Sequence, residues 1–479
     1  MSDAPPATPE PNARRAWGLP LLVVAAVALR LGTLAQSPFD IDAALLTAGV
    51  RHFDPTAMQP HPPGYAGLIG LARLLPVEPA LALRLLSAFS VAPLLVFTAA
   101  VARRVGAEPL TAAALVAMSP VTWLYGITEN AYALGAAGAV WTAWSCQRAQ
   151  EKPSHERALW VGLALGVTGA LRPSLLVFLA PMACWGVGLR GLPAFAVGAA
   201  LPTATWIAAS AAASGGLLVF LGAVVDQFGV ARSFRPEHWR LHQLHQLAVY
   251  LLQCVSGGAL LLVWLRRVPG PWALFALWIG VPFTFHALVY LAKPGYLLCY
   301  LPALAVILAS APAPRWARAL APSASALFFL LADPIDLDRD PSPRKPFSEK
   351  SRAELVRAEA SFFAMTSLNR VHDQARANHA YVALIQPLVD PGRTIVLHID
   401  RWEVALADAL LTGVSVRDSN TDQLGVPAGG TRLIVLAFDS PGPGFRLVRD
   451  AQGYAVWVRD LTVAELPIQI AWMRLVPAW

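Results

Sequence analysis

The residues best suited to carry out chemistry lie near the start of the chain, in the stretch from Ser37 to Tyr65. Two aspartates, Asp40 and Asp42, stand two positions apart, and Asp54 and His61 follow them. A carboxylate can remove a proton from a hydroxyl group, so this stretch is a candidate for general-base chemistry. Asp40 can equally cap a helix, and Asp42 can complement the dipole of that helix, so a structural role for both stays open.

The residues after Asp42 predict the element that carries it. Apolar residues recur there at helical spacing on one side, which is typical of an amphipathic helix. They are Leu45, Leu46, Gly49, Val50 and Phe53. The sequence therefore predicts a helix lying along a membrane surface, with acidic residues at its start and a proline-rich corner, Pro60–Tyr65, at its end.

The overall composition is that of a membrane protein. The chain has 479 residues, of which 56% are hydrophobic and only 14% are charged. So apolar a composition over this length predicts many membrane spans. The formal net charge of +7 is then a signal of topology. Nucleic-acid binding is not expected, because no basic stripe interleaved with aromatic residues is found.

The sequence offers no strong metal-binding motif. The four cysteines lie in or beside apolar segments without the spacing of metal ligands, which is typical of small residues in a membrane core. His238, His242 and His245 have no added glutamate or cysteine at ligand spacing, so an interfacial basic helix is favoured over a metal site. No residue is assigned to a metal, and participation of a divalent cation stays open.

About eleven apolar segments predict membrane-spanning helices, several of them shorter than the usual ~20 residues. They cover residues 16–36, 79–102, 110–127, 130–147, 158–171, 173–189, 192–210, 241–265, 271–291, 295–311 and 316–332. Arginines concentrate on alternate connections, which places these connections and the N-terminus on the cytoplasmic side. An odd number of spans then places the C-terminus outside. This topology requires residues 61–76 to form a helix that does not cross the membrane.

The composition also divides the chain into regions. Residues 1–15 predict a disordered cytoplasmic tail, and residues 16–332 a membrane-embedded domain whose first external loop is 37–78. Residues 333–350 predict a charged, proline-rich linker, and residues 351–479 a small extracytoplasmic α/β domain. The elements expected near and within that domain are a helix over 349–386 and strands over 393–399, 432–438 and 454–459.

The predicted topology sorts the charged residues. No aspartate or glutamate lies in the middle of a span, whereas Asp42, Glu129, Arg172 and Lys293 all fall outside. Lys293 is one of only four lysines in the chain, and it opens the tenth span on the face where the topology rule disfavours a lysine. Any chemistry is therefore expected at the outer surface.

Taken in order, these motifs resemble those of the GT-C superfamily of integral-membrane glycosyltransferases. The resemblance is to the polyprenyl-phosphate-sugar-dependent type, which includes protein mannosyltransferases and aminoarabinose transferases. It covers roughly residues 16–312 and departs from the commonest pattern in having Ala66-Gly67 after Gly64-Tyr65. The segments that carry it are Asp42, Phe53-Asp54, Gln59–Tyr65, Thr128–Tyr132, Gly169–Ser174, Lys293–Tyr296 and Leu301–Ala303.

The resemblance implies an all-α GT-C-like bundle that moves a sugar from a polyprenyl phosphate donor to a glycan, lipid or protein acceptor. Transfer is expected with inversion, at the outer face of the cytoplasmic membrane. The resemblance puts the general base at Asp42, favoured over Asp40 by its spacing to Phe53-Asp54. It places the donor phosphate at Lys293, Arg172 and His61, and the acceptor or sugar at Glu129, Asp54 and Tyr65.

Several alternatives remain at this point. Glu129 can be an ordinary acid at a helix N-terminus, Arg172 an interface arginine reaching for water, and His61 a ring stacked in the corner. A transporter or lipid flippase with a lipid-phosphate site is the main alternative in function, and a scaffold that has lost catalysis is another. A transporter should carry ionisable groups at the membrane midplane, and the absence of acids there favours the enzyme.

Overall fold

The computed structural model describes residues 17–233, 239–289, 293–332, 366–398 and 401–477, the last range with gaps at 419–422, 427–430, 438–444, 452–453, 462–467 and 471–472. The predicted tail 1–15, the predicted linker 333–350 and the part of the predicted helix before residue 366 lie outside the described residues. Side chains are not described at 230–243, so nothing follows about His238 and His242.

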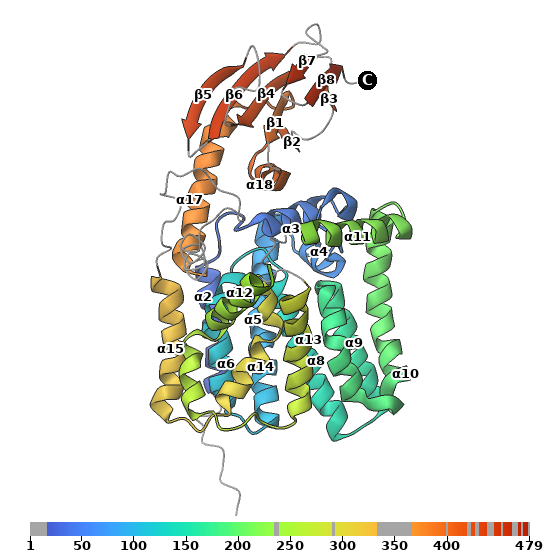
Figure 1. Ribbon diagram of the computed structural model, residues 1–479, viewed down its shortest axis with the longest axis vertical. Coiled ribbons are helices and arrows are strands. Elements are labelled where there is room, and N and C mark those ends of the chain that lie inside the picture. Colours follow the sequence, from blue (N-terminus) through green and yellow to red (C-terminus); the bar gives the residue numbers. More distant parts are fainter. Residues whose placement is uncertain are drawn as a thin grey trace, which may run out of the picture.

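Most of the described chain is a bundle of helices that run between two ends (Figure 1). They are α2 (Gly18–Gly32), α5 (Pro79–Arg104), α6 (Pro109–Met118), α7 (Pro120–Tyr125), α8 (Tyr132–Glu151), α9 (His155–Leu171), α10 (Ser174–Ala213), α12 (Trp239–Val255), η2 (Ser256–Trp264), α13 (Trp272–Leu288), η3 (Pro294–Cys299), α14 (Leu301–Ala309) and α15 (Arg315–Leu331). Each predicted span corresponds to one of these helices, to a consecutive pair, or to half of α10. Two predicted spans meet in α10, where Gly188 leaves the helical conformation with φ 63° and ψ 172°.

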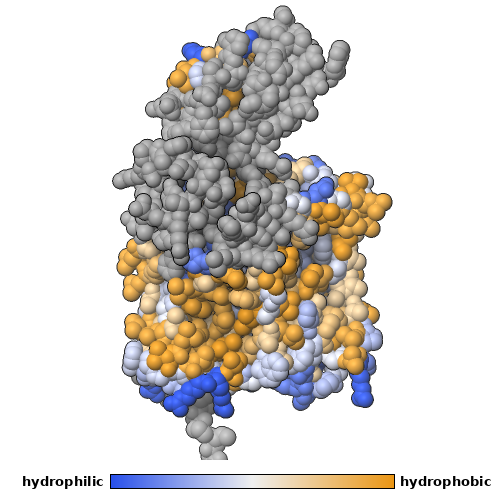
Figure 2. Space-filling view, in the orientation of Figure 1, coloured by the Kyte–Doolittle hydropathy of each residue, from blue (hydrophilic) through white to orange (hydrophobic). Residues whose placement is uncertain are grey.

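The outer surface of the bundle is apolar, as a lipid environment requires. Among the residues that the structure describes, three helices are each long and apolar enough to cross a membrane: Pro79–Arg104, Ser174–Ala213 and Leu244–Trp264. Figure 2 shows a broad apolar band across the visible face of the bundle and hydrophilic residues along its lower edge. A band of this kind on a soluble protein would be a large aggregation surface, so the chain is an integral membrane protein.

Breaks in the spans expose main-chain groups that need partners. Ser119 separates α6 from α7, whose first residue, Pro120, cannot supply the N–H that a continuous helix uses. Arg30, fully buried in α2, donates to the carbonyl of Ala117 over 2.7 Å and to that of Ala26 over 2.9 Å. A charged residue within a span thus serves to satisfy a helix end.

Three short helices lie at the upper end of the bundle. They are α3 (Ile41–Arg51), α4 (Ala66–Arg73) and α11 (Leu217–Ser233), with the 3-10 turn η1 (Pro55–Ala57) between the first two. α3 and α11 run across the bundle instead of along it (Figure 1). The predicted surface helix after Asp42 is present as α3, and the helix predicted within 61–76 is present as the short α4. The sequence analysis did not anticipate α11.

The C-terminal part is a small α/β domain above the same end of the bundle (Figure 1). It begins with α17 (Leu368–Ile385) and η6 (Gln386–Leu388), and α18 (Arg401–Leu410) connects its first two strands. The strands are β1 (Thr394–His398), β2 (Val414–Asp418), β3 (Gln423–Val426), β4 (Thr431–Ala437), β5 (Arg446–Ala451), β6 (Tyr454–Leu461), β7 (Ile468–Ile470) and β8 (Met473–Pro477).

Two sheets organise these strands. The five-stranded sheet has the order β2-β1-β4-β6-β5, in which β2, β1 and β4 are parallel and β6 and β5 are antiparallel additions. α18 supplies the crossover that parallel neighbours need. The three-stranded sheet has the order β3-β8-β7. The three predicted strands are confirmed as β1, β4 and β6.

The arginine pattern predicts which end of the bundle faces the cytoplasm. We expect Arg376→Cys on α17, a position 75% exposed, to react with a membrane-impermeant maleimide in intact cells. Lys152→Cys, in the exposed connection after α8, should react only once the membrane has been opened, because basic connections stay inside. Labelling of the unsubstituted protein provides the background, since Cys184 is exposed. The opposite labelling pattern would reverse the topology.

Candidate functional site

The first turn of α3 sets the positions of the two neighbouring aspartates. Asp40 is extended, with φ −144° and ψ 179°, and its carboxylate accepts a hydrogen bond from the main-chain N–H of Ala43 over 2.8 Å. Asp40 is therefore the N-cap of α3, as predicted. Asp42 stands within the first turn of the helix and does not cap it, which leaves its carboxylate free to meet other elements.

Asp42 forms an ion pair with a residue far away in the sequence. The Nζ of Lys293 donates to Oδ2 of Asp42 over 2.8 Å, across a separation of 251 residues. The hydroxyl of Tyr132, at the start of α8, lies 3.4 Å from the same oxygen. The Asp42 side chain is 15% exposed and that of Lys293 is 42% exposed, so the pair is shielded but reachable from one side.

The positive charges around Asp42 control its ionisation. Burial by itself would raise the pKa of Asp42, but Lys293 outweighs this effect, helped by His61 and Arg172, and the pKa is held well below its ordinary value. Burial and the neighbouring Asp42 raise the pKa of Asp40 to about 6, against the opposing effect of Lys293. Two carboxylates two residues apart thus have pKa values shifted in opposite directions.

Arg172 is a buried cation stacked between aromatic rings. Its Cζ lies 4.0 Å from the ring centroid of Tyr132 and 5.2 Å from that of Tyr296, and the residue is 7% exposed. The imidazole of His286 stacks on the ring of Tyr296, with the two ring centroids 5.3 Å apart. Arg172 ends α9 immediately before Pro173, a position where extended backbone is favoured. Within the described residues, no carboxylate is paired with Arg172, so its charge is available to an anion.

The segment Lys293-Pro294-Gly295-Tyr296 is shaped by close contact with α8. A Cβ placed on Gly295 would come within 2.7 Å of the ring of Tyr132, which real Cβ atoms essentially never do. Glycine is therefore required for η3 to approach this ring. Lys293 is the N-cap residue of η3, and this approach brings its side chain over α3.

The proline-rich corner brings His61 and Tyr65 together. Nε2 of His61 lies 3.2 Å from the hydroxyl of Tyr65, and Nδ1 is buried with no hydrogen-bond partner in the described part of the chain. Tyr65 has φ 51°, in the left-handed region that a tyrosine rarely adopts, and follows Gly64 at φ 96°. Such strain is often stored at functional sites.

His61 belongs to the electrostatic environment of Asp42. Burial lowers its pKa, Asp42 raises it, and Lys293 and Arg172 lower it further, so that the net shift is downward. The imidazole is therefore mostly neutral at pH 7. In this state His61 can donate a hydrogen bond to an anion but adds little positive charge.

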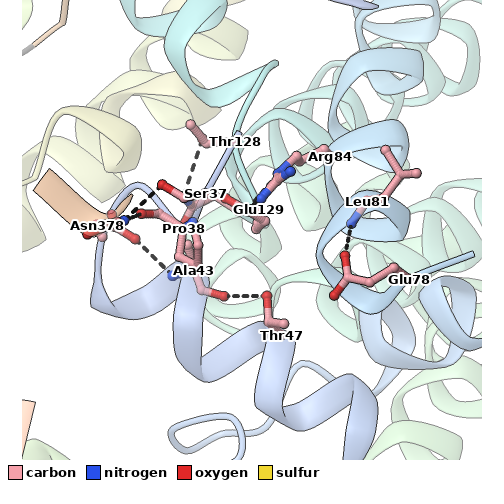
Figure 3. Close-up of polar contacts among 12 residues, drawn as sticks. Ser37, Pro38, Ala43, Thr47, Glu78, Leu81, Arg84, Thr128, Glu129 and Asn378 are labelled. Atoms are coloured by element: carbon pink, nitrogen blue, oxygen red, sulfur yellow. Dashed lines mark hydrogen bonds and ion pairs between the residues drawn. The ribbon is translucent and has the colours of Figure 1, made fainter. Parts of the chain in front are cut away.

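Glu129 lies in the connection between α7 and α8, where it pairs with Arg84 of α5. Its side chain is 0% exposed, and its Oε1 accepts from Nε of Arg84 over 2.6 Å (Figure 3). Its Oε2 is buried with no partner among the residues that the structure describes. Burial raises the pKa of Glu129 to about 7, although Arg84 lowers it. The predicted contact of Glu129 with sugar or acceptor stays a prediction.

Asp54 is engaged in its own loop. Its Oδ1 accepts from the main-chain N–H of Thr56 over 2.9 Å and from the hydroxyl of the same residue over 2.7 Å. It also caps η1 through Ala57, and its backbone forms a bridge with Gln59. The structure thus gives Asp54 a role in closing the loop, and its predicted contact with the sugar also stays a prediction.

The structure therefore brings Asp42, Lys293, Arg172 and His61 into one electrostatic cluster. The sequence analysis did not assign roles to Tyr132 and Tyr296, the two rings that hold Arg172. The sequence did contain a signal for them, because two of the segments that carry the resemblance, Thr128–Tyr132 and Lys293–Tyr296, each end in a tyrosine. No group of three or more His, Cys, Asp or Glu residues that could hold a metal ion occurs among the described residues.

Comparison with solved structures shows which class of fold this is. ArnT from Cupriavidus metallidurans bound to undecaprenyl phosphate aligns with a TM-score of 0.59 and 14% sequence identity, over 92% of this chain and 98% of ArnT. Apo ArnT aligns with a TM-score of 0.60 and 14% identity, over 93% of this chain and 98% of ArnT. The chain therefore has the GT-C fold, as the order of its motifs predicted.

Other comparisons add little. The archaeal oligosaccharyltransferase AglB from Archaeoglobus fulgidus, in complex with an inhibitory peptide and a dolichol-phosphate, aligns over 83% of this chain and 64% of AglB. At 15% identity its TM-score of 0.35 is too low to carry an argument. No family model matches the chain, and no curated protein matches its sequence.

The Glu129–Arg84 pair predicts a pH-dependent stability defect. Arg84→Ala should destabilise the protein by about 3–5 kcal/mol, because it leaves a buried carboxylate without its cation. Since the folded-state pKa of Glu129 is already raised to about 7, stability is lost as the pH rises through that value. The loss should therefore be larger at about pH 8 than at about pH 5.5. Thermal unfolding in detergent measures the loss of stability at both pH values.

Two further variants provide the controls. Arg84→Lys keeps a cation and should be milder, and Glu129→Gln in the Arg84→Ala background should recover stability at high pH. Equal loss at both pH values would mean that Arg84 acts through packing and not through charge.

Proposed function

We propose that this protein is a glycosyltransferase that moves a sugar from a polyprenyl phosphate to an acceptor hydroxyl at the outer end of its bundle. The observation that supports it most is the shielded cluster in which Asp42 pairs with Lys293 beside the aromatic-stacked Arg172. It combines a carboxylate with two cations that suit a phosphate. ArnT, which shares the fold, has been crystallised bound to undecaprenyl phosphate.

The cations suit the leaving group of this reaction. When the bond between the anomeric carbon and the phosphate oxygen breaks, negative charge grows on the lipid phosphate, and fixed positive charge in a water-poor site stabilises it. Arg172 is held by ring stacking and not by a carboxylate, so it can bind phosphate oxygens through a planar, bidentate contact. Lys293, at the N-cap of η3, faces the same cluster.

The ion pair gives Asp42 two states. Paired with Lys293, it is ionised but a weak base. A donor phosphate competes for Lys293, and loss of that partner raises the pKa of Asp42, which makes it a stronger base. The acceptor oxygen then attacks the anomeric carbon opposite the phosphate, its proton passes to Asp42, and the polyprenyl phosphate leaves. The product has inverted configuration.

The alternative of a transporter finds less support in the arrangement of charges. A transport pathway should place ionisable groups near the middle of the bundle, facing one another or a water-filled cavity. Arg30 is a charged residue within a span, but its hydrogen bonds go to the main-chain carbonyls of Ala26 and Ala117. The Asp42 cluster lies instead at helix ends.

The choice of base can be tested by comparing two neighbouring residues. Asp42→Asn keeps the shape of the side chain but cannot accept the proton, so transfer should fall by about 10²–10⁴-fold. Asp40→Asn should be milder, because asparagine caps a helix about as well as aspartate. The measurement is release of undecaprenyl phosphate from a panel of undecaprenyl-phosphate hexoses and pentoses, in membranes that retain the acceptor.

Damage to the loop as a whole would affect both variants alike, and correct insertion can be followed by yield and thermal unfolding. Equal losses in both variants, or a larger loss at Asp40, would show that Asp42 is not the base. Full activity in both would remove this loop from the reaction.

Lys293 should affect both donor binding and pH dependence. Lys293→Ala removes a charge-assisted contact of about 1.5–3 kcal/mol, so the apparent KM for donor should rise roughly 10- to 100-fold. The same change raises the pKa of Asp42 in the free enzyme, so the acid limb of the kcat/KM–pH profile should move to higher pH. Lys152→Ala, at an exposed position after α8, is the matched control and should change neither. An unchanged KM and pH profile in Lys293→Ala would leave Lys293 with only an anchoring role.

A further inference from the structure

The C-terminal domain contacts the segment that leads into Asp42. Asn378, on α17, is 3% exposed, and its Nδ2 donates to the hydroxyl of Ser37 over 2.9 Å and to the carbonyl of Pro38 over 2.8 Å. Figure 3 shows the Asn378 amide facing this part of the α2–α3 loop, which comprises residues 33–40. A side chain from the C-terminal domain therefore reaches the main chain just before the N-cap of α3.

The amide of Asn378 is itself held in one orientation. Nε2 of Gln374, one turn earlier on α17, donates to Oδ1 of Asn378 over 3.0 Å. Ser37 is also buried, at 6% exposed. Both the oxygen and the nitrogen of this buried amide form hydrogen bonds, so reorienting it would leave polar groups unpaired. The contact therefore restrains the position of Ser37 and Pro38.

The same loop is anchored independently by the bundle. The main-chain N–H of Ala35 donates to the carbonyl of Ile127 over 3.0 Å. Ala35 thus ties the loop to the connection between α7 and α8, and Ser37 and Pro38 tie it to α17. Asp40 follows two residues after the second anchor and Asp42 four, so little freedom remains between anchor and carboxylate.

The domain also contacts the helix that carries Asp42. α18 packs against α3, and the two helices lie next to each other where the domain meets the bundle (Figure 1). The C-terminal domain therefore contacts both the α2–α3 loop and α3. Neither contact lies within the cluster formed by Asp42, Lys293 and Arg172.

We propose that the C-terminal domain clamps the α2–α3 loop and that Asn378 is a positioning residue, which holds Asp42 in register with Lys293 for the reaction. The inference rests on the proposed function for its catalytic consequence. The hydrogen bonds of Asn378 go to Ser37, Pro38 and Gln374 and not to the Asp42 cluster, so Asn378 acts through the hydroxyl of Ser37 and the carbonyl of Pro38.

The kinetic test separates positioning from binding. Asn378→Ala should lower kcat by about 10- to 100-fold, because small misplacements of a catalytic group are costly. The apparent KM for the undecaprenyl-phosphate sugar should change by less than about threefold, because Lys293 and Arg172 stand on other elements. Asn378→Asp keeps the shape but cannot donate to Pro38, so it should be at least as impaired. Arg376→Ala, exposed on the same helix, should behave as wild type.

The pH profile provides a readout that a purely structural role would not move. Among the described residues, the charged and titratable groups that interact with Asp42 are Lys293, His61, Arg172, Asp40, Tyr125 and Tyr132. If loss of the Asn378 contact lets Asp42 move away from Lys293 in the free enzyme, the acid limb of the kcat/KM–pH profile should move to higher pH. A variant that only lowers the amount of folded enzyme would leave the shape of the profile unchanged, and that result would overturn the positioning role.

Hydrogen exchange tests the clamp without any activity assay. In the full-length protein, Asn378→Ala should speed amide exchange across residues 37–46 by about tenfold or more, while residues 132–151 of α8 stay as in wild type. Unchanged exchange at 37–46 would overturn the clamp, whatever the activity. Wild-type protein that releases no undecaprenyl phosphate from any donor of the panel would overturn the proposed function, and the exchange result would still decide the clamp.

Discussion

The ion pair between Asp42 and Lys293 is the interaction on which the polar end of this bundle depends. Two opposite charges that are shielded from water are tolerated only when they pair with each other and their remaining polar atoms form hydrogen bonds. The pair joins α3, which lies across the end of the bundle, to the start of η3, and Gly295 lets η3 pack against the ring of Tyr132. One contact of 2.8 Å thus connects two residues that are 251 positions apart in the sequence.

The same end is built where helices stop. Arg172 follows the end of α9, Lys293 precedes η3, and α6 breaks before Pro120. Helix ends leave main-chain N–H and C=O groups without partners in the helix. Lipid cannot form hydrogen bonds with these groups, so buried side chains do. Nε1 of Trp278 donates to the carbonyl of Cys299 over 2.7 Å. The hydroxyl of Ser119 donates to the carbonyl of Cys254 over 2.8 Å. Irregular backbone is thus paired inside the protein, which leaves room for charged side chains at the rim.

The sequence could predict what depends on local pattern. Hydropathy located the apolar helices, and the order of short motifs singled out Asp42, Arg172 and Lys293, which the structure brings together. The pairing of Asp42 with Lys293 could not be predicted, because nothing local specifies a contact between such distant residues. α11 was missed because its apolar run is too short for a span. β5, with the sequence RLVRDA, was missed because it lacks the continuous apolar run of β4, TRLIVLA. The contact of Asn378 with Ser37 depends on how two domains dock, which no periodicity encodes.

Charge balance connects the resting cluster to the proposed reaction. Asp40 and Asp42 are opposed by Lys293 and Arg172, so the resting cluster is close to neutral. Burial, together with the neighbouring charge of Asp42, raises the pKa of Asp40 to about 6 in spite of Lys293. A sugar linked through a phosphodiester brings one more negative charge. The added charge competes for Lys293 and raises the proton affinity of the carboxylates at the moment when a hydroxyl must lose its proton. In the proposed reaction, the proton gained by Asp42 offsets the charge that develops on the departing phosphate, so the cluster does not have to hold the full excess of negative charge.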